Sequence, residues 1–187
     1  MDDELRKALA AGDAAAAGRV VDLHGPAMFR VAYRLLGSRH DAEDVVAEVF
    51  AAMVRHRERL ADVTDVKAYL FASLRHVAGR VLCERRRQAI TGLDESQWPA
   101  SGGGLGGGGG ESGVSADLED AEETERLWAM VARLPEEQRE VLALKVQGEL
   151  SFREIGEIFG ISANTAASRY RYALEKLQRM VERERHS

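Results

Sequence analysis

Five polar side chains lie close together near the end of the chain and could bind a nucleic acid. They are Asn164, Thr165, Ser168, Arg169 and Arg171. Amide, hydroxyl and guanidinium groups donate hydrogen bonds to phosphate oxygens and to the edges of bases. These residue types and spacings therefore favour noncovalent recognition, in which no bond is made or broken.

The surrounding stretch, residues 151–172, contains the signals of two helices joined by a tight turn. Ser151 and Glu154 match a capping box at the start of the first helix. Gly160 permits the turn, and Ser162 can cap the second helix, which carries the five donors. The pattern predicts a helix-turn-helix. An ordinary helical hairpin with a solvated charged face is the alternative.

A cluster of acids lies in the first half of the chain. We expect a helix that begins at His40 with Asp41 as its cap. Glu43, Asp44 and Glu48 fall on the side of this helix opposite its apolar stripe. A solvated face explains these acids, and a docking surface for a partner protein is the functional alternative.

Arginines gather in the C-terminal half of the next predicted helix, which Thr64 or Asp65 can cap. Five of them fall within 13 residues: Arg75, Arg80, Arg85, Arg86 and Arg87. A helix dipole favours cations near the C-terminus, so a structural explanation is available. Their number exceeds what capping requires, and a nucleic-acid surface is the sharper hypothesis.

The composition favours an all-α fold, because Ala, Leu, Glu and Arg dominate and β-branched runs are few. We expect helix over residues 3–36, broken near Gly12 and again near Gly25-Pro26, and a polar connector over residues 57–65. The lone cysteine, Cys83, excludes an internal disulfide and suits a reducing cytosol. We interpret it as a buried apolar residue and not as a nucleophile.

Residues 99–115 contain nine glycines and read as a flexible linker. No Gly-Lys-Ser/Thr follows the run, so a phosphate-binding loop is not expected. The linker predicts two small helical domains, residues 1–97 and 117–187, joined by the Gly-rich residues 98–116.

The net charge of −5 is unevenly distributed. Residues 1–110 are balanced, residues 111–125 hold seven acids and no base, and residues 126–187 hold 11 basic and nine acidic side chains. A chain this weakly basic should bind free DNA poorly, because phosphate neutralisation supplies most nonspecific affinity. It would need a dimer partner or a larger assembly.

Two segments resemble one family, the bacterial RNA polymerase sigma factors of the extracytoplasmic-function (ECF) class. Region two of that class is similar to Phe29–Gly37, Asp41–Val46 and Phe50. Region four is similar to Leu134–Leu142, Glu154-Ile155, Gly160–Ser162, Thr165, Ser168-Arg169, Ala173 and Leu177. Both motifs in this order, split by a linker, make the resemblance specific.

The resemblance implies a dissociable subunit that brings core RNA polymerase to promoter DNA and starts transcription. By position, the polymerase-docking helix carries Asp41, Glu43, Asp44 and Glu48. The stretch that approaches the −10 element carries Arg75, His76, Arg80, Arg85, Arg86 and Arg87. The helix that reads the −35 element carries Asn164, Thr165, Ser168, Arg169 and Arg171.

The same resemblance sets expectations about partners. An anti-sigma factor commonly restrains members of the class, and its existence and identity here stay open. We expect no cofactor, no metal, no small-molecule substrate and no enzymatic activity. The acidic N-terminus lacks a signal peptide's regions, and no apolar run is long enough to cross a bilayer, so a cytoplasmic protein without membrane insertion is expected.

Two rival functions are weaker. A dimeric helix-turn-helix regulator would share the DNA-reading helix, but no dimerisation heptad is evident and a glycine linker would space two reading heads poorly. An enzyme is disfavoured because no HExxH or CxxC motif occurs. Co-purification with core polymerase supports the sigma reading, and tight binding to a palindrome without polymerase supports the regulator.

Overall fold

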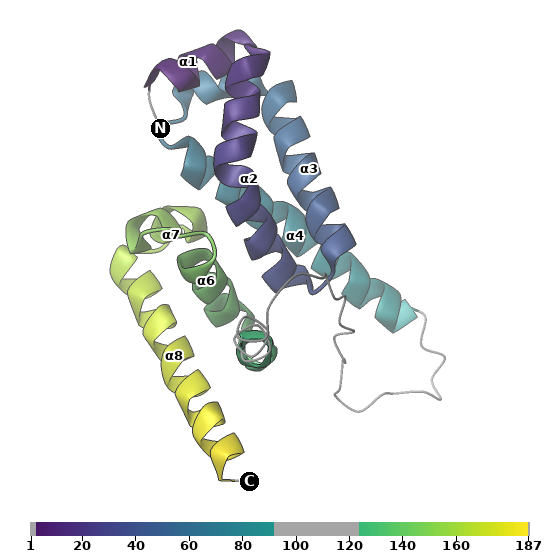
Figure 1. The fold of residues 1–187 in the computed structure, drawn as a ribbon, viewed down its shortest axis with the longest axis vertical. Helices are drawn as coiled ribbons and strands as arrows, with labels where there is room; N and C mark the ends of the chain where they lie inside the picture. Colours follow the sequence, from purple (N-terminus) through teal and green to yellow (C-terminus); the bar gives the residue numbers. More distant parts are fainter. Residues whose placement is uncertain (1–2, 92–123, 187) are drawn as a thin grey trace, which may run out of the picture. The chain divides into compact units, whose positions relative to one another are not determined.

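The computed structural model describes residues 3–91 and 124–186, and all regular structure within them is helical (Figure 1). These residues form two compact units, one from each range. The all-α, two-domain prediction is confirmed. The predicted linker, residues 98–116, lies outside the described residues, and so do the ends of the two predicted domains that flank it.

The first unit is built on three packed helices, α2 (Ala14–Leu36), α3 (Arg39–Arg55) and α4 (Val66–Thr91). The short α1 (Asp3–Ala11) packs against α2 and against a 3-10 helix, η1 (Arg57–Asp62). Apolar side chains at helical spacing meet between these helices. The largest fully buried ones include Phe71, Met28, Met53, Leu60, Leu70 and Leu74.

The break between α1 and α2 is confirmed, whereas the predicted break at Gly25-Pro26 is wrong. Gly12 adopts a left-handed conformation, and the Asp13 side chain caps α2 by accepting hydrogen bonds from the amides of Ala15 and Ala16. α2 then runs unbroken through Pro26. Proline removes one backbone donor from a helix interior, but the buried stripe continues on both sides of it through Val20 and Met28. Tertiary packing therefore outweighs the local cost.

α3 begins one residue before the predicted His40, but its N-cap differs from the prediction by three residues. Ser38, and not Asp41, is the N-cap, because the Ser38 hydroxyl accepts from the Asp41 amide at 3.3 Å. Asp41 lies inside the first turn, so its carboxylate is left to contact other groups. Of the two predicted caps of α4, Thr64 and Asp65, the structure uses Asp65, whose Oδ1 accepts from the Ala68 amide at 3.1 Å. The connector before it contains η1, whose Leu60 is fully buried.

The C-terminal part of α4 extends beyond the core. The last buried residue of this helix is Ala78, and none of residues 79–90 is buried. Cys83 is consequently exposed, and the prediction of a buried cysteine is wrong. The reason is helical spacing, because Cys83 follows the exposed His76 by seven residues and so shares the outward face of α4.

His24 gives the first unit a predictable pH dependence. Its imidazole is buried, and within the described residues Nε2 has no hydrogen-bond partner. Burial, followed by the charge of Lys67, lowers the pKa of His24 below its ordinary 6.5, with Asp65 opposing. The unfolded chain therefore takes up a proton near pH 6.5 that the folded chain resists.

We expect the free energy of unfolding of the full chain to fall as the pH drops below about 6.5. His24→Leu should flatten that part of the profile, because it removes the buried titratable group. Denaturant titrations at several pH values measure this. Carboxylates such as Asp41 act at lower pH, since the pKa of Asp41 lies below 3.8. An unchanged slope between pH 7 and 5.5 in the variant would contradict the assignment.

The second unit comprises helical residues 124–131, α6 (Glu136–Val146), α7 (Phe152–Phe159) and α8 (Ala163–Arg185). α8 packs against both α6 and α7. The core of the second unit includes Val131, Leu134, Leu142 and Ala173, with Trp128 and Leu177 packed against them. Pro135 directly precedes α6.

Gly160 makes the turn between α7 and α8, at φ +66°. A Cβ added there would meet nothing within 4 Å, so the cost of substitution is purely conformational. We expect Gly160→Ala to lower the free energy of unfolding of this unit by about 1–2 kcal/mol. Gly18→Ala is a matched control, because Gly18 lies inside a helix with equally open surroundings. Chemical denaturation should show a loss for the first variant only.

Candidate polymerase and nucleic-acid interfaces

Capping interactions fix the helix-turn-helix as the sequence predicts. The Ser151 hydroxyl accepts from the Glu154 amide at 3.2 Å, and the Glu154 carboxylate accepts from the Ser151 amide at 2.6 Å. The Ser162 hydroxyl caps α8 by accepting from the Thr165 amide at 3.0 Å. Gly156 allows close approach at the turn, because an added Cβ would lie 2.7 Å from the Ile161 carbonyl. The start of α8 is therefore held rigidly.

Four of the five predicted donors lie away from the buried face of α8. That buried face is marked by Ala166 and Ala173. Asn164, Thr165 and Arg171 are exposed, and Ser168 between them is half-buried. Arg171 donates to the Ser168 hydroxyl at 3.2 Å, while the hydroxyls of Thr165 and Ser162 lie 2.8 Å apart. The structure thus presents amide, hydroxyl and guanidinium groups on one outward surface.

Arg169 has different surroundings from the other four donors. Its guanidinium pairs with Glu137 of α6 at 2.8 Å and lies over the Phe159 ring, 5.8 Å from the centroid. Only 25% of its side chain is exposed. Position 169 follows the buried Ala166 by three residues, so helical spacing places it beside the core. Arg169 therefore ties α8 to α6 and to the end of α7.

The acids of α3 each lie beside a basic side chain. Glu43 accepts from Arg39 at 2.8 Å, and Asp44 lies 3.5 Å from Nε2 of His40. Glu48 pairs with Arg80, which belongs to α4. All three carboxylates are exposed. The structure thereby pairs Glu48, which was predicted to dock on the polymerase, with Arg80, which was predicted to approach the −10 element.

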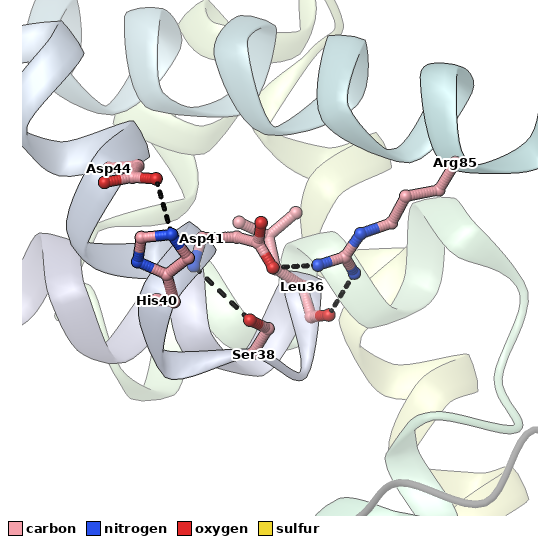
Figure 2. Close-up of polar contacts among 6 residues, drawn as sticks. All are labelled: Leu36, Ser38, His40, Asp41, Asp44 and Arg85. Carbon is pink, nitrogen blue, oxygen red and sulfur yellow. Dashed lines mark hydrogen bonds and ion pairs between the residues drawn. The ribbon is translucent and has the colours of Figure 1, made fainter. Parts of the chain in front are cut away.

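Asp41 and Arg85 meet at the junction of three helices (Figure 2). One guanidinium nitrogen of Arg85 pairs with the Asp41 carboxylate, and the other donates to the Leu36 carbonyl at 2.8 Å. Leu36 ends α2. The hydrogen bond with Ser38, followed by the nearby Arg85 and His40, lowers the pKa of Asp41. The Asp41 carboxylate thus stays ionised in its pair with Arg85.

Comparison with known proteins identifies the family. Residues 20–88 match the model of sigma-70 region 2, and residues 124–177 match that of sigma-70 region 4. The ECF RNA polymerase sigma factor SigW of Bacillus subtilis is 29% identical over 179 residues, covering 91% of each chain. SigL of Mycobacterium tuberculosis, of the same class, is 28% identical over 174 residues, covering 90% of each. The chain belongs to the ECF sigma factors.

Solved structures support the fold of this sigma factor. One is CnrH in complex with the cytosolic domain of CnrY, with a TM-score of 0.65, 20% identity and 95% coverage of both chains. Another is the sigma factor RpoE with the anti-sigma factor NepR from Bartonella quintana, with a TM-score of 0.65 and 22% identity. That match covers 88% of this chain and 96% of RpoE. As a sigma factor, the chain directs RNA polymerase to specific promoters.

The remaining predicted −10 residues all lie within the C-terminal two thirds of α4. His76, Arg80 and Arg87 are exposed and share one helix face, since they are spaced by four and seven residues. Arg86 is exposed, Arg75 is half-buried, and Arg87 also pairs with Glu84. Arg85 lies on the opposite face, in line with the buried Leu74 and Ala78. The predicted −10 set thus includes Arg85, which faces α2 and α3, among residues on the outward faces of α4.

Residues 3–91 and 124–186 contain no group of three His, Cys, Asp or Glu side chains that could hold a metal ion. No helix within them is long and apolar enough to span a bilayer.

Proposed function

We propose that the two units of this sigma factor make separate contacts with one holoenzyme–promoter complex. The first unit docks on core RNA polymerase through the acidic face of α3 and presents the end of α4 to the −10 element. The second unit places the start of α8 in the major groove of the −35 element. The observation that carries this assignment is the capped helix-turn-helix, whose second helix exposes Asn164, Thr165 and Arg171.

The geometry of α8 suits major-groove reading. An α-helix fits that groove, and residues near its N-terminus reach base edges in helix-turn-helix proteins. Asn164 and Thr165 lie in the first turn and Arg171 two turns further on. Amide and guanidinium groups make paired hydrogen bonds to adenine and guanine respectively. We assign Asn164 and Thr165 to base contacts, and Ser168 and Arg171 to the neighbouring phosphates.

The charge balance of the chain supports a division of labour with the polymerase. Residues 126–187 hold only two more basic than acidic side chains, too few for strong nonspecific DNA binding. We assign most of the DNA affinity to the polymerase and selection to this chain. Glu43, Asp44 and Glu48 offer exposed carboxylates to a basic polymerase surface, and His76, Arg80, Arg86 and Arg87 offer cations to −10 DNA, with Arg75 beside them.

The same proposal covers partners and location. The structures of CnrH and RpoE each contain a second protein, in the second case an anti-sigma factor. We propose that an anti-sigma factor likewise restrains this chain by covering its polymerase-docking surface. We also propose that the chain works in the cytoplasm, where polymerase and promoters are, and that it performs no catalytic step of its own.

Substitutions on α8 test the −35 assignment. We expect Asn164→Ala with Arg171→Ala to lower transcription from a −35-dependent promoter by about tenfold or more, because the lost base contact of Asn164 costs about 1–3 kcal/mol and the lost phosphate contact of Arg171 weakens binding further. Core binding should be unchanged. Run-off transcription and a core-binding competition measure the two effects. Loss of core binding with intact promoter preference would reverse the role given to α8.

Arg169→Ala tests whether Arg169 contacts DNA directly or holds α8 in position against α6. Because Arg169 pairs with Glu137, we expect Arg169→Ala to lower −35-dependent transcription and Glu137→Ala to lower it to the same extent. Neither variant should weaken core binding. If Arg169→Ala alone changes the preferred base at one position, then Arg169 reads DNA directly.

A further inference from the structure

The pair formed by Asp41 and Arg85 is better enclosed than the neighbouring pair formed by Glu48 and Arg80. Its two side chains are 30% and 40% exposed, against 52% and 57% for Glu48 and Arg80. Arg85 also uses both arms of its guanidinium, one on the carboxylate and one on the Leu36 carbonyl. A rigid fork of this kind fixes geometry in a way that a single charge does not.

Each group in this cluster is already satisfied by another part of the domain. Leu36 is the last residue of α2, so its carbonyl has no partner within that helix. Asp41 lies in the first turn of α3, where a carboxylate is favoured and where it also bonds Ser38. Arg85 connects both helix ends to α4 (Figure 2). Both charged side chains are therefore already engaged within the domain.

The position of Arg85 along α4 explains what the cluster does. Core burial of α4 ends at Ala78, seven residues earlier, which is about 10 Å along a helix. The cations on the outward faces of α4, including Arg80 and Arg87, lie in this uncovered part. Arg85 anchors the uncovered part on its inner face. It therefore sets the direction in which the outward cations point, relative to the acidic face of α3.

We propose that Asp41 and Arg85 are a positioning pair that fixes the arginine-bearing end of α4 against α2 and α3. Asp41 does not touch the polymerase, and Arg85 does not touch DNA. The pair holds the docking acids and the −10 cations at one relative geometry, so that a docked domain presents its cations in register with the promoter. This inference rests on the proposed function and replaces the roles that the sequence suggested for these two residues.

A double-mutant cycle in the full chain tests the proposal. Asp41→Ala, Arg85→Ala and the double variant are compared for core binding and for open-complex formation at saturating core polymerase. We expect each single variant to slow open-complex formation by about tenfold, the cost of one lost charged hydrogen bond. The double variant should be no slower than either, and core affinity should stay within about twofold of the wild type.

Two conservative variants keep the test decisive if the alanine variants unfold. Arg85→Lys keeps the charge but loses the fork, so a positioning role predicts a defect close to that of Arg85→Ala, whereas a phosphate contact predicts near-normal opening. Asp41→Asn keeps an acceptor for Ser38 and should leave core affinity unchanged. Arg179→Ala is the matched control, because Arg179 loses only an exposed pair with Glu175.

The outcomes distinguish this inference from the proposed function. Additive defects, with Asp41→Ala lowering core affinity and Arg85→Lys behaving as wild type, would overturn the positioning role while leaving the sigma function intact. A wild-type chain that fails to bind core polymerase would instead overturn the proposed function itself.

Discussion

Replacing Glu43, Asp44 and Glu48 by lysine is expected to weaken binding of the chain to core RNA polymerase by about 100-fold or more. Like charges placed opposite one another at an interface cost several kcal/mol, and each 1.4 kcal/mol is tenfold in affinity. The three carboxylates are exposed on one helix, so their reversal leaves the apolar core untouched. Titration of labelled chain with core polymerase at fixed salt measures the loss.

A matched variant controls for net charge in this experiment. Glu175, Glu182 and Glu184 are exposed on α8, and changing them to lysine alters the net charge by the same amount. We expect this control to bind core polymerase with close to wild-type affinity. The loss in the α3 variant should shrink as salt is raised, because exposed charges are screened. Equal losses in both variants would show that overall charge, and not the acidic face of α3, governs docking.

The second large effect is expected from Phe71→Ala, which should destabilise the first unit by about 3–5 kcal/mol. Phe71 is fully buried, and its helix, α4, packs on α2 and α3. A loss of that size approaches the whole stability of a small domain. We therefore expect core binding to fail at 37 °C. Chemical denaturation followed by circular dichroism measures the change in free energy.

Ile90→Ala is the control for this substitution on the same helix. Ile90 is 72% exposed, so its truncation should cost less than about 0.5 kcal/mol. If Phe71→Ala cost no more than the control, the packing of α4 described above would be wrong.

The helix-turn-helix was predictable because its signals are local. Ser151 with Glu154, Gly160 and Ser162 lie within a dozen residues, and each acts on the backbone beside it. The cap of α3 was misplaced because Ser38 and Asp41 are both good capping residues three positions apart, and the sequence does not say which one the chain uses. The expectation that Pro26 breaks the helix failed because packing outweighs this local signal. Buried residues on both sides of Pro26 keep α2 continuous.

The site was only partly predictable because its decisive contacts join distant residues. Nothing in the sequence alone shows that Arg85 meets Asp41, 44 residues earlier. Helical spacing does place Arg85 in line with Leu74 and Ala78, a signal that separates it from Arg80 and Arg87. The same spacing places Arg169 beside Ala166. Cys83 follows His76 by seven residues, so spacing also places it on the outward face of α4, although free cysteines are usually buried.

The most direct test of the sigma assignment is in vitro transcription with core RNA polymerase on a library of duplex promoter fragments, with start sites mapped. We expect transcripts to begin at defined positions only when the chain is present, downstream of paired elements at −35 and −10. Absence of both core binding and chain-dependent transcripts, or tight binding to one palindrome without polymerase, would contradict the account.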